Sequence, residues 1–117
     1  MRADQGPVAV LTLNRPVARN CLSENLLAAL HAAITEIGGS DAVRAIVITG
    51  AGSAFSSGHD LKELSSHRTD PDRGKAYFAK IMDACSRMML SIVRSPKPVI
   101  AAVNGIATAA GCQLAAT

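Results

Sequence analysis

"VRAIVITGAGSAFSSGHD" (Val43–Asp60) is the stretch that decides the fold class of this chain. Its first half is a short β-branched run, which is typical of a buried strand. The run passes at Gly50 directly into a loop rich in glycine and serine. A similar passage follows later, where the β-like run in "PVIAAVNGIATAAGCQL" (Pro98–Leu114) stops at Asn104-Gly105. The two passages indicate that the same arrangement, a strand that leads directly into a glycine-containing loop, occurs twice.

Hydrophobic periodicity predicts the other elements. A capping serine, apolar residues at helical spacing and a pair of glycines delimit the first helix. The predicted elements are a strand at Val8–Leu13, a helix from the cap Ser23 to Gly38-Gly39, a strand at Val43–Gly50, a helix that includes Tyr77–Ile92, a strand in "SPKPVIAAVNG", and a last helix from about Ala110. The glycine loop through Leu64 and the charged stretch Ser65–Arg73 are predicted to be loops. This order of strands and helices places the chain in the α/β class.

Composition excludes several classes of function. The chain has 117 residues, of which 49% are hydrophobic and 18% charged, a profile typical of one globular domain with a modest core. Aromatic residues make up only 3%, so stacking on nucleic acid is not expected. The net charge is only +3 and the basic residues are scattered along the sequence, so they are predicted to be solvated surface residues. No signal-peptide pattern is visible and no apolar run is long enough to span a membrane, so no membrane partner is expected.

The cysteines point to a reducing compartment. The chain has 3 of them, Cys21, Cys85 and Cys112, and none forms a C-x-x-C pair. An odd number without such a motif favours reduced thiols, and each is expected to be a small buried apolar residue. A cytoplasmic location is therefore expected, with the mitochondrial matrix as the alternative.

The first glycine loop does not match the common phosphate-binding or nucleophile motifs. A dinucleotide fingerprint would need a third glycine where this chain has Phe55, which makes a Rossmann-type nucleotide binder a poor third hypothesis. Neither a G-K-S/T sequence nor a G-x-S-x-G elbow is present. His59 and Asp60 could suggest a metal pair, but the histidines stand at unrelated spacings, so no metal site is predicted.

Both loops could present backbone N–H groups to a ligand. His59 could act through its imidazole as a general base, but the preferred interpretation is that it acts through the direction of its backbone N–H. Ala107–Gly111 carry almost no side chain, and the first N–H groups of a helix that begins there would be unpaired. Two such loops aimed at one oxygen would form an oxyanion hole. Alternatively, the small residues let a helix pack tightly on a strand, and spacing leaves both readings open.

Three segments together resemble the enoyl-CoA hydratase/isomerase, or crotonase, superfamily. They are "LNRPVARNCLS" (Leu13–Ser23), "AIVITGAGSAFSSGHDLKEL" (Ala45–Leu64) and "PKPVIAAVNGIATAAGCQL" (Pro96–Leu114), in the order and spacing of that family. The resemblance implies a crotonase-like α/β fold, a ββα superhelix. Residues 1–117 would be the N-terminal part of a single domain, truncated within the helix after Gly111.

The resemblance also implies a site. Members of the family bind an acyl-CoA thioester and hold its carbonyl in an oxyanion hole, which here would consist of the backbone N–H groups of His59 and Ala110. Gln113 stands where hydrating relatives carry the first of two catalytic glutamates, and the second would lie beyond Thr117. The residues expected to contact coenzyme A or substrate are Ala54, Ser56, Gly58, Asp60, Lys62 and Gly111. Coenzyme A would enter as part of the substrate, with no other cofactor.

Two functions remain open at this point. One is an enzyme that stabilises a thioester enolate, with hydration disfavoured because glutamine cannot accept a proton as a carboxylate does. The other is an acyl-CoA-binding protein with little or no turnover. The resemblance implies that the parent protein forms homotrimers or hexamers.

Overall fold

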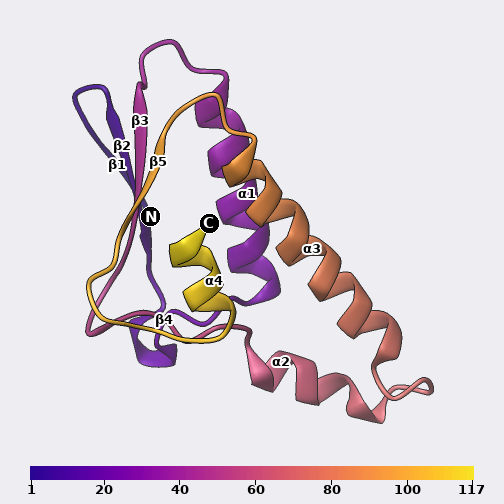
Figure 1. Cartoon of the computed structure of the whole chain (residues 1–117). Coiled ribbons are helices and arrows are strands. Elements are labelled where there is room, and N and C mark those ends of the chain that lie inside the picture. The colour runs from indigo at the N-terminus through magenta and orange to yellow at the C-terminus, as the bar shows by residue number, and fades with distance from the viewer.

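The computed structural model describes all residues, 1–117. A four-stranded sheet lies on one side of the molecule, and helices cover one of its faces (Figure 1). The sheet has the order β1-β2-β3-β5, formed by Arg2–Gln5, Val8–Leu13, Ala45–Gly50 and Val99–Ala102, and a second sheet pairs β4 (Ala54–Ser56) with β6 (Ile106–Ala107). The helices are α1 (Glu24–Gly38), α2 (Leu61–Ser66), α3 (Lys75–Val93) and α4 (Ala110–Ala116), with short 3-10 turns at Pro16–Ala18 and His67–Thr69. The predicted α/β class is confirmed.

Parallel pairing organises the main sheet. β3 pairs with β2 on one side, with Leu11 opposite Ile48, and with β5 on the other, with Ile48 opposite Ala101. Parallel neighbours need crossover connections, which contain α1 between β2 and β3 and α3 between β3 and β5. The carboxyl ends of β3 and β5 therefore meet at one edge, and both glycine loops start there.

The core lies between this sheet and the helices. Alternate residues of β2 and β3 are buried, among them Leu11 and Ile48, and they pack in one cluster with Ile34 of α1 and Met88 of α3. The other face of β3, with Val47, is only half-buried, so the predicted buried strand is fully buried on one face. Helices on one face of the sheet are sufficient to bury the alternate residues that point toward that face.

Several predicted loops contain regular structure. Residues 61–66 form α2 because the Asp60 carboxylate accepts hydrogen bonds from the backbone N–H groups of Lys62 (3.1 Å) and Glu63 (3.3 Å). β1, β4, β6 and the 3-10 turn at His67–Thr69 were not predicted either. The other boundaries are close to prediction, and the last helix begins at Ala110 as expected.

The cysteine prediction holds only in part. Cys21 and Cys85 are buried, whereas Cys112 is exposed. Cys112 follows the buried Gly111 on α4, and the next residue on a short helix turns away from the core. No helix of the chain is both long and apolar enough to cross a lipid bilayer.

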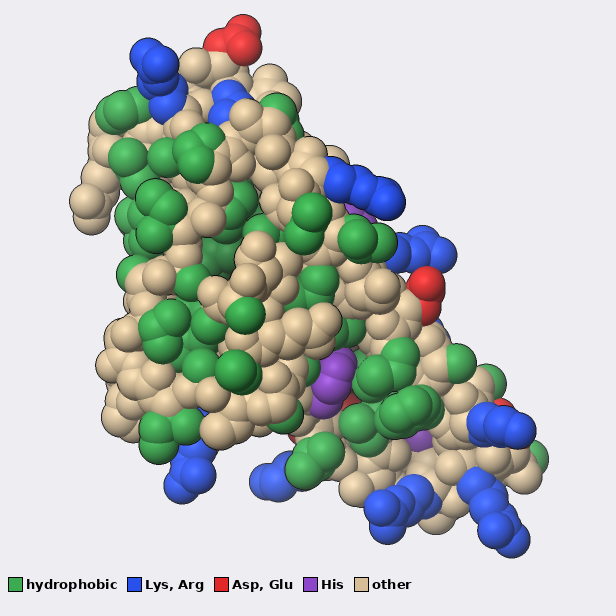
Figure 2. Space-filling model, viewed as in Figure 1, with side chains coloured by type: hydrophobic (Ala, Val, Ile, Leu, Met, Phe, Trp, Pro, Cys, Tyr) green, Lys and Arg blue, Asp and Glu red, His purple; other side chains and the backbone are tan.

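Part of the surface is apolar. Hydrophobic side chains gather over the middle of the face drawn in Figure 2, and Lys and Arg side chains stand along its margins. The exposed large hydrophobic residues of the whole chain include Val93, Ile100, Val103 and Ile106. Contiguous apolar surface of this kind is typical of contact surfaces.

Asn20 is a fully buried polar residue that ties the segment after β2 to the first glycine loop. Its Oδ1 accepts a hydrogen bond from Arg15 N–H (2.8 Å), and its Nδ2 donates to the carbonyls of Ala51 (2.9 Å) and Ala54 (2.8 Å). Ser56 Oγ donates in turn to the Asn20 carbonyl (2.9 Å). A buried group with all its hydrogen bonds formed fixes one arrangement of the segments around it.

Replacing Asn20 by alanine should destabilise the fold by about 2–4 kcal/mol, because it leaves buried N–H and C=O groups without partners. Asn104 is the matched control, since it also makes three such bonds, to Gly50 N–H, Gly52 O and Ala54 O, but is exposed. Asn104→Ala should cost about 1 kcal/mol or less. Urea unfolding of both variants measures the difference, and equal losses would contradict the role given to Asn20.

Candidate functional site

The two glycine loops lie side by side although they are about fifty residues apart in sequence. β4 and β6 pair in parallel, with Ala54 opposite Ile106, and Thr108 N–H donates to Ser56 O (3.1 Å). The Thr108 hydroxyl also donates to the Ser57 carbonyl (3.3 Å). These contacts bring the segments just after β4 and just after β6 to the same place.

His59 and Ala110 have backbone N–H groups that donate to no acceptor within the chain. By contrast, the N–H of the neighbouring Asp60 donates to Leu22 O (3.3 Å). Gly58 brings the two segments close, since a Cβ built on it would lie 3.2 Å from Ala110 N. The N–H of Ala110 is free because the first N–H groups of a helix have no partner within it, and the N–H of His59 lies in the neighbouring segment, so both are available to a ligand.

Two cavities share His59. One, of about 490 Å³, is lined by basic and small residues that include Arg15, Arg19, Ser57 and Lys62, and we call it the basic groove. The other, of about 330 Å³, is lined on the α3 side by Met82, Cys85, Met89, Leu90 and Val93 and on the α4 side by Gln113, and we call it the apolar pocket. A larger cavity, of about 570 Å³, lies between α2 and the start of α3 and is lined by neither His59 nor Ala110.

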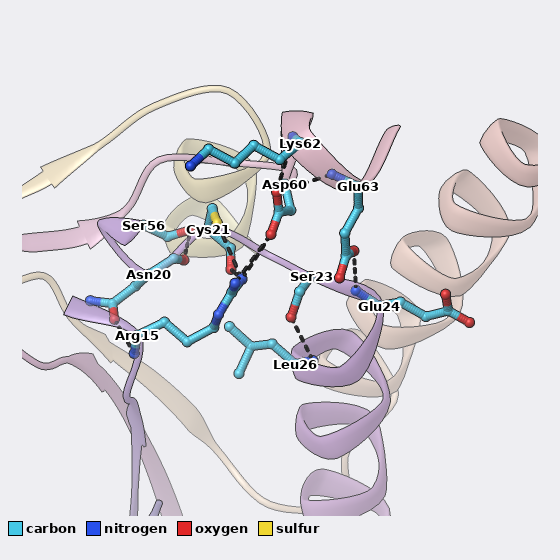
Figure 3. Close-up of polar contacts among 10 residues, drawn as sticks. All are labelled: Arg15, Asn20, Cys21, Ser23, Glu24, Leu26, Ser56, Asp60, Lys62 and Glu63. Atoms are coloured by element: carbon cyan, nitrogen blue, oxygen red, sulfur yellow. Dashed lines mark hydrogen bonds and ion pairs between the residues drawn. The ribbon is translucent and has the colours of Figure 1, made fainter. Parts of the chain in front are cut away.

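The Asp60 carboxylate is occupied by the protein itself. It caps α2 and pairs with the Arg15 guanidinium at 3.2 Å (Figure 3). Burial raises the pKa of Asp60, but hydrogen bonds from Glu63 N–H and Arg15 outweigh it, and the net pKa lies below its ordinary value. Asp60 was predicted to contact the ligand; it lines the basic groove, and its contacts within the chain hold the loop that carries His59.

Arg15 connects three parts of the site wall. Besides Asp60, its guanidinium donates to Cys21 O (3.0 Å) and contacts Cys21 Sγ (3.2 Å), as Figure 3 shows. Arg19 and Lys62 are exposed and form no ion pair. The basic groove therefore has one arginine engaged in the fold and two cations available to solvent.

Other predicted site residues are buried. Ala54 and Ser56 have almost no exposed surface, and Ser56 Oγ accepts from Gly58 N–H (3.3 Å). A Cβ on Gly111 would lie 2.1 Å from Ser56 O, so this glycine permits α4 to approach β4. Close packing, the second reading of the small residues, thus accounts for Gly111. Gln113 is exposed and lines the apolar pocket with His59.

Sequence reasoning missed Arg15 and Asn20. Both lie in "LNRPVARNCLS", which was used only as a mark of resemblance. One signal was available, since asparagine is among the residues that tolerate a positive φ, and Asn20 has φ 53° in the turn after the 3-10 helix. The pairing of Arg15 with Asp60, 45 residues away, has no local signal.

No cluster of three or more His, Cys, Asp or Glu side chains is placed to hold a metal ion. His59 and Asp60 are adjacent, but the Asp60 carboxylate is bonded to Arg15 and to α2. The geometry therefore provides backbone donors and two contrasting cavities rather than a ligand set.

Residues 3–117 match the protein family described as enoyl-CoA hydratase/isomerase. The chain is 43% identical over 107 residues to human "Enoyl-CoA hydratase domain-containing protein 3, mitochondrial", covering 92% of this chain and 34% of that protein. It is 38% identical to a "Probable enoyl-CoA hydratase" of Rhizobium meliloti, covering 95% of this chain and 40% of that protein. The chain therefore spans between a third and two fifths of the curated relatives named here.

A solved structure of enoyl-CoA hydratase from Mycobacterium smegmatis has the same fold. It superposes with a TM-score of 0.88 at 49% sequence identity, covering 97% of this chain and 43% of that chain. The crotonase-like fold expected from the sequence is confirmed for the residues present here.

Replacing Asp60 by asparagine should lower the unfolding free energy at pH 7 by about 1–3 kcal/mol, because a charged hydrogen-bond acceptor is lost while the cap is retained. The folded-state pKa is depressed, so this stabilisation is present above the unfolded pKa of about 3.9 and is lost as pH falls through the folded pKa. Urea titrations at a series of pH values should show the two proteins converging in acid.

Asp83→Asn is the matched control for this experiment. Asp83 pairs with Arg87 at 2.9 Å on the exposed face of α3, and its loss should cost about 0.5 kcal/mol or less. A difference between Asp60→Asn and wild type that stays constant from pH 7 to acid would contradict the assignment.

Proposed function

The chain belongs to the enoyl-CoA hydratase/isomerase family, and on that premise we propose that its two glycine loops bind an acyl-CoA thioester. The thioester oxygen would accept hydrogen bonds from the backbone N–H groups of His59 and Ala110. One observation carries the proposal: both N–H groups lack an acceptor within the chain, and the loops that bear them are in contact. A carbonyl oxygen has two lone pairs and can accept both.

Such an arrangement suits enolate chemistry. When a proton leaves the carbon next to a thioester, negative charge develops on the carbonyl oxygen. Donors that are already in place stabilise this charge without reorganisation, and one such donor is worth about 3 kcal/mol in comparable sites. Because both donors are backbone groups, their hydrogen bonds to the oxygen do not depend on the side chains at these two positions.

The two cavities fit the two ends of the same ligand. Coenzyme A carries phosphates, and Arg19 and Lys62 offer unpaired positive charge in the basic groove. An acyl chain is apolar, and Met82, Met89 and Val93 line the apolar pocket. The thioester joins these two parts of the ligand, and His59 is the residue that the two cavities share.

Gln113 decides which reaction we favour. A glutamine amide can hydrogen-bond a water molecule but cannot take its proton. We therefore favour double-bond isomerisation or another enolate reaction over hydration. The same observation supports a second candidate, an acyl-CoA-binding protein with little or no turnover.

We also propose an oligomeric state and a location for the whole protein. A homotrimer or hexamer is supported by the exposed apolar side chains, which include Ile100 and Ile106. The word "mitochondrial" in the name of the human relative favours the mitochondrial matrix over the cytoplasm. No cofactor beyond the coenzyme A of the substrate is proposed.

Butyryl-CoA should bind about tenfold or more tightly than the S-butyl-CoA thioether, which has the same length but no carbonyl. Two hydrogen bonds of about 0.5–1.5 kcal/mol each account for this ratio. Isothermal titration calorimetry of both ligands measures it. Free coenzyme A is the control for contacts made by the nucleotide alone, and equal affinity of the two acyl ligands would refute the oxyanion role of the N–H groups.

Replacing Gln113 by glutamate should create or raise hydration of crotonyl-CoA, because a carboxylate in the apolar pocket can accept a proton from water. General acid–base groups contribute about 10²–10⁴-fold. The loss of the enoyl thioester absorbance measures the reaction, and Gln113→Ala controls for the change in pocket size. No gain in a variant that binds crotonyl-CoA normally would argue that Gln113 does not face the reacting carbon.

A further inference from the structure

Nδ1 of His59 is the one buried side-chain nitrogen or oxygen in the chain that has no hydrogen-bond partner. Leaving such a group unpaired costs roughly 1–3 kcal/mol, and native proteins rarely tolerate it without a function or a missing partner. The ring belongs to the same residue whose backbone N–H is unpaired. Two polar groups of His59, a residue that lines both cavities, therefore lack partners.

The charged groups that line a cavity together with His59 all belong to the basic groove. They are Arg15, Arg19, Asp60 and Lys62. Asp60 is already bonded to Arg15 and to the N–H groups of α2, so its carboxylate does not pair with the imidazole. No acidic or basic side chain of α3 or α4 lines the apolar pocket.

Within the apolar pocket, His59 is the group suited to proton exchange near neutral pH. Gln113, Ser86 and Thr117 do not titrate in that range. Cys85 also lines the pocket, but burial raises the pKa of its thiol and keeps it protonated. The imidazole alone combines access to the pocket with a proton affinity near neutrality.

Resting on the proposed function, we infer that the imidazole of His59 is a catalytic acid/base of this site. One ring nitrogen takes a proton from the carbon next to the bound thioester. The electron pair of the broken C–H bond moves into the thioester, and the charge on its oxygen is held by the N–H groups of His59 and Ala110. The imidazolium then returns its proton to the same carbon or, in an unsaturated chain, to the carbon two bonds further along.

Burial favours the form of the ring that this step needs. It lowers the pKa of His59 because the imidazolium is poorly solvated there, so the ring is neutral at pH 7. A base that acts when neutral loses activity as pH falls through its pKa. Proton transfer should therefore persist to pH values below about 6.5, the ordinary value for imidazole, and then decline.

Deuterium incorporation into butyryl-CoA tests the inference. The wild-type protein, incubated with the ligand in D₂O, should exchange the protons next to the thioester, as followed by mass spectrometry. His59→Gln keeps hydrogen-bonding groups but cannot carry the proton, so exchange should fall about 10²-fold or more while calorimetry still detects binding. His31→Gln on α1, outside both cavities, is the control and should exchange at the wild-type rate.

The outcomes separate the two claims. Normal exchange in a His59→Gln protein that binds butyryl-CoA would overturn the inference, and so would wild-type protein that binds butyryl-CoA without exchanging it. Failure of the wild type to bind would instead refute the proposed function. The wild-type pH profile tests the inference without any variant, since exchange that does not change between pH 8 and pH 5 excludes titration of the imidazole as its cause.

Discussion

The candidate site depends on two backbone contacts that leave no room for a Cβ atom. A Cβ on Gly105 would lie 2.0 Å from Ser53 O, and one on Gly111 would lie 2.1 Å from Ser56 O. Gly105 lies between β5 and β6 and Gly111 in the first turn of α4, whereas the two carbonyls belong to the first glycine loop and to β4. The loops can therefore approach only where the second one carries no side chain. The parallel pairing of β4 with β6 and the proximity of the two free N–H groups follow from this approach.

Polar side chains also hold the first glycine loop in place. Asn20 and Arg15, both in the segment after β2, bind the first loop through the carbonyl of Ala54 and the carboxylate of Asp60. The apolar core between the sheet and the helices supports the loops but does not orient their N–H groups. Hydrogen bonds do so because they are directional, whereas apolar packing is not.

The sequence predicts the elements that carry their own signal. β2, α1, β3, α3 and β5 follow from apolar periodicity, caps and proline, and the start of α4 follows from its small residues. β1 was missed because its four residues are all exposed, and β4 and β6 because each is defined by its distant partner. At the site, His59, Ala110 and Gln113 were named from the family resemblance, which assigned a role to the backbone N–H of His59 and none to its imidazole. Only the surroundings of Nδ1 bear on a role for the imidazole, and residues distant in sequence determine them.

Ala109, the residue before α4, has φ 50° and ψ −127°, a conformation that residues other than glycine rarely adopt. Its methyl group removes backbone freedom that a glycine would have at this position. The restriction acts on the peptide unit that contains the N–H of Ala110. Under the proposed function, alanine would trade folding stability for a lower loss of conformational entropy on binding, because the donor would be held in place before a ligand arrives. Recognition by this loop would in that sense be rigid, with its ordering completed during folding.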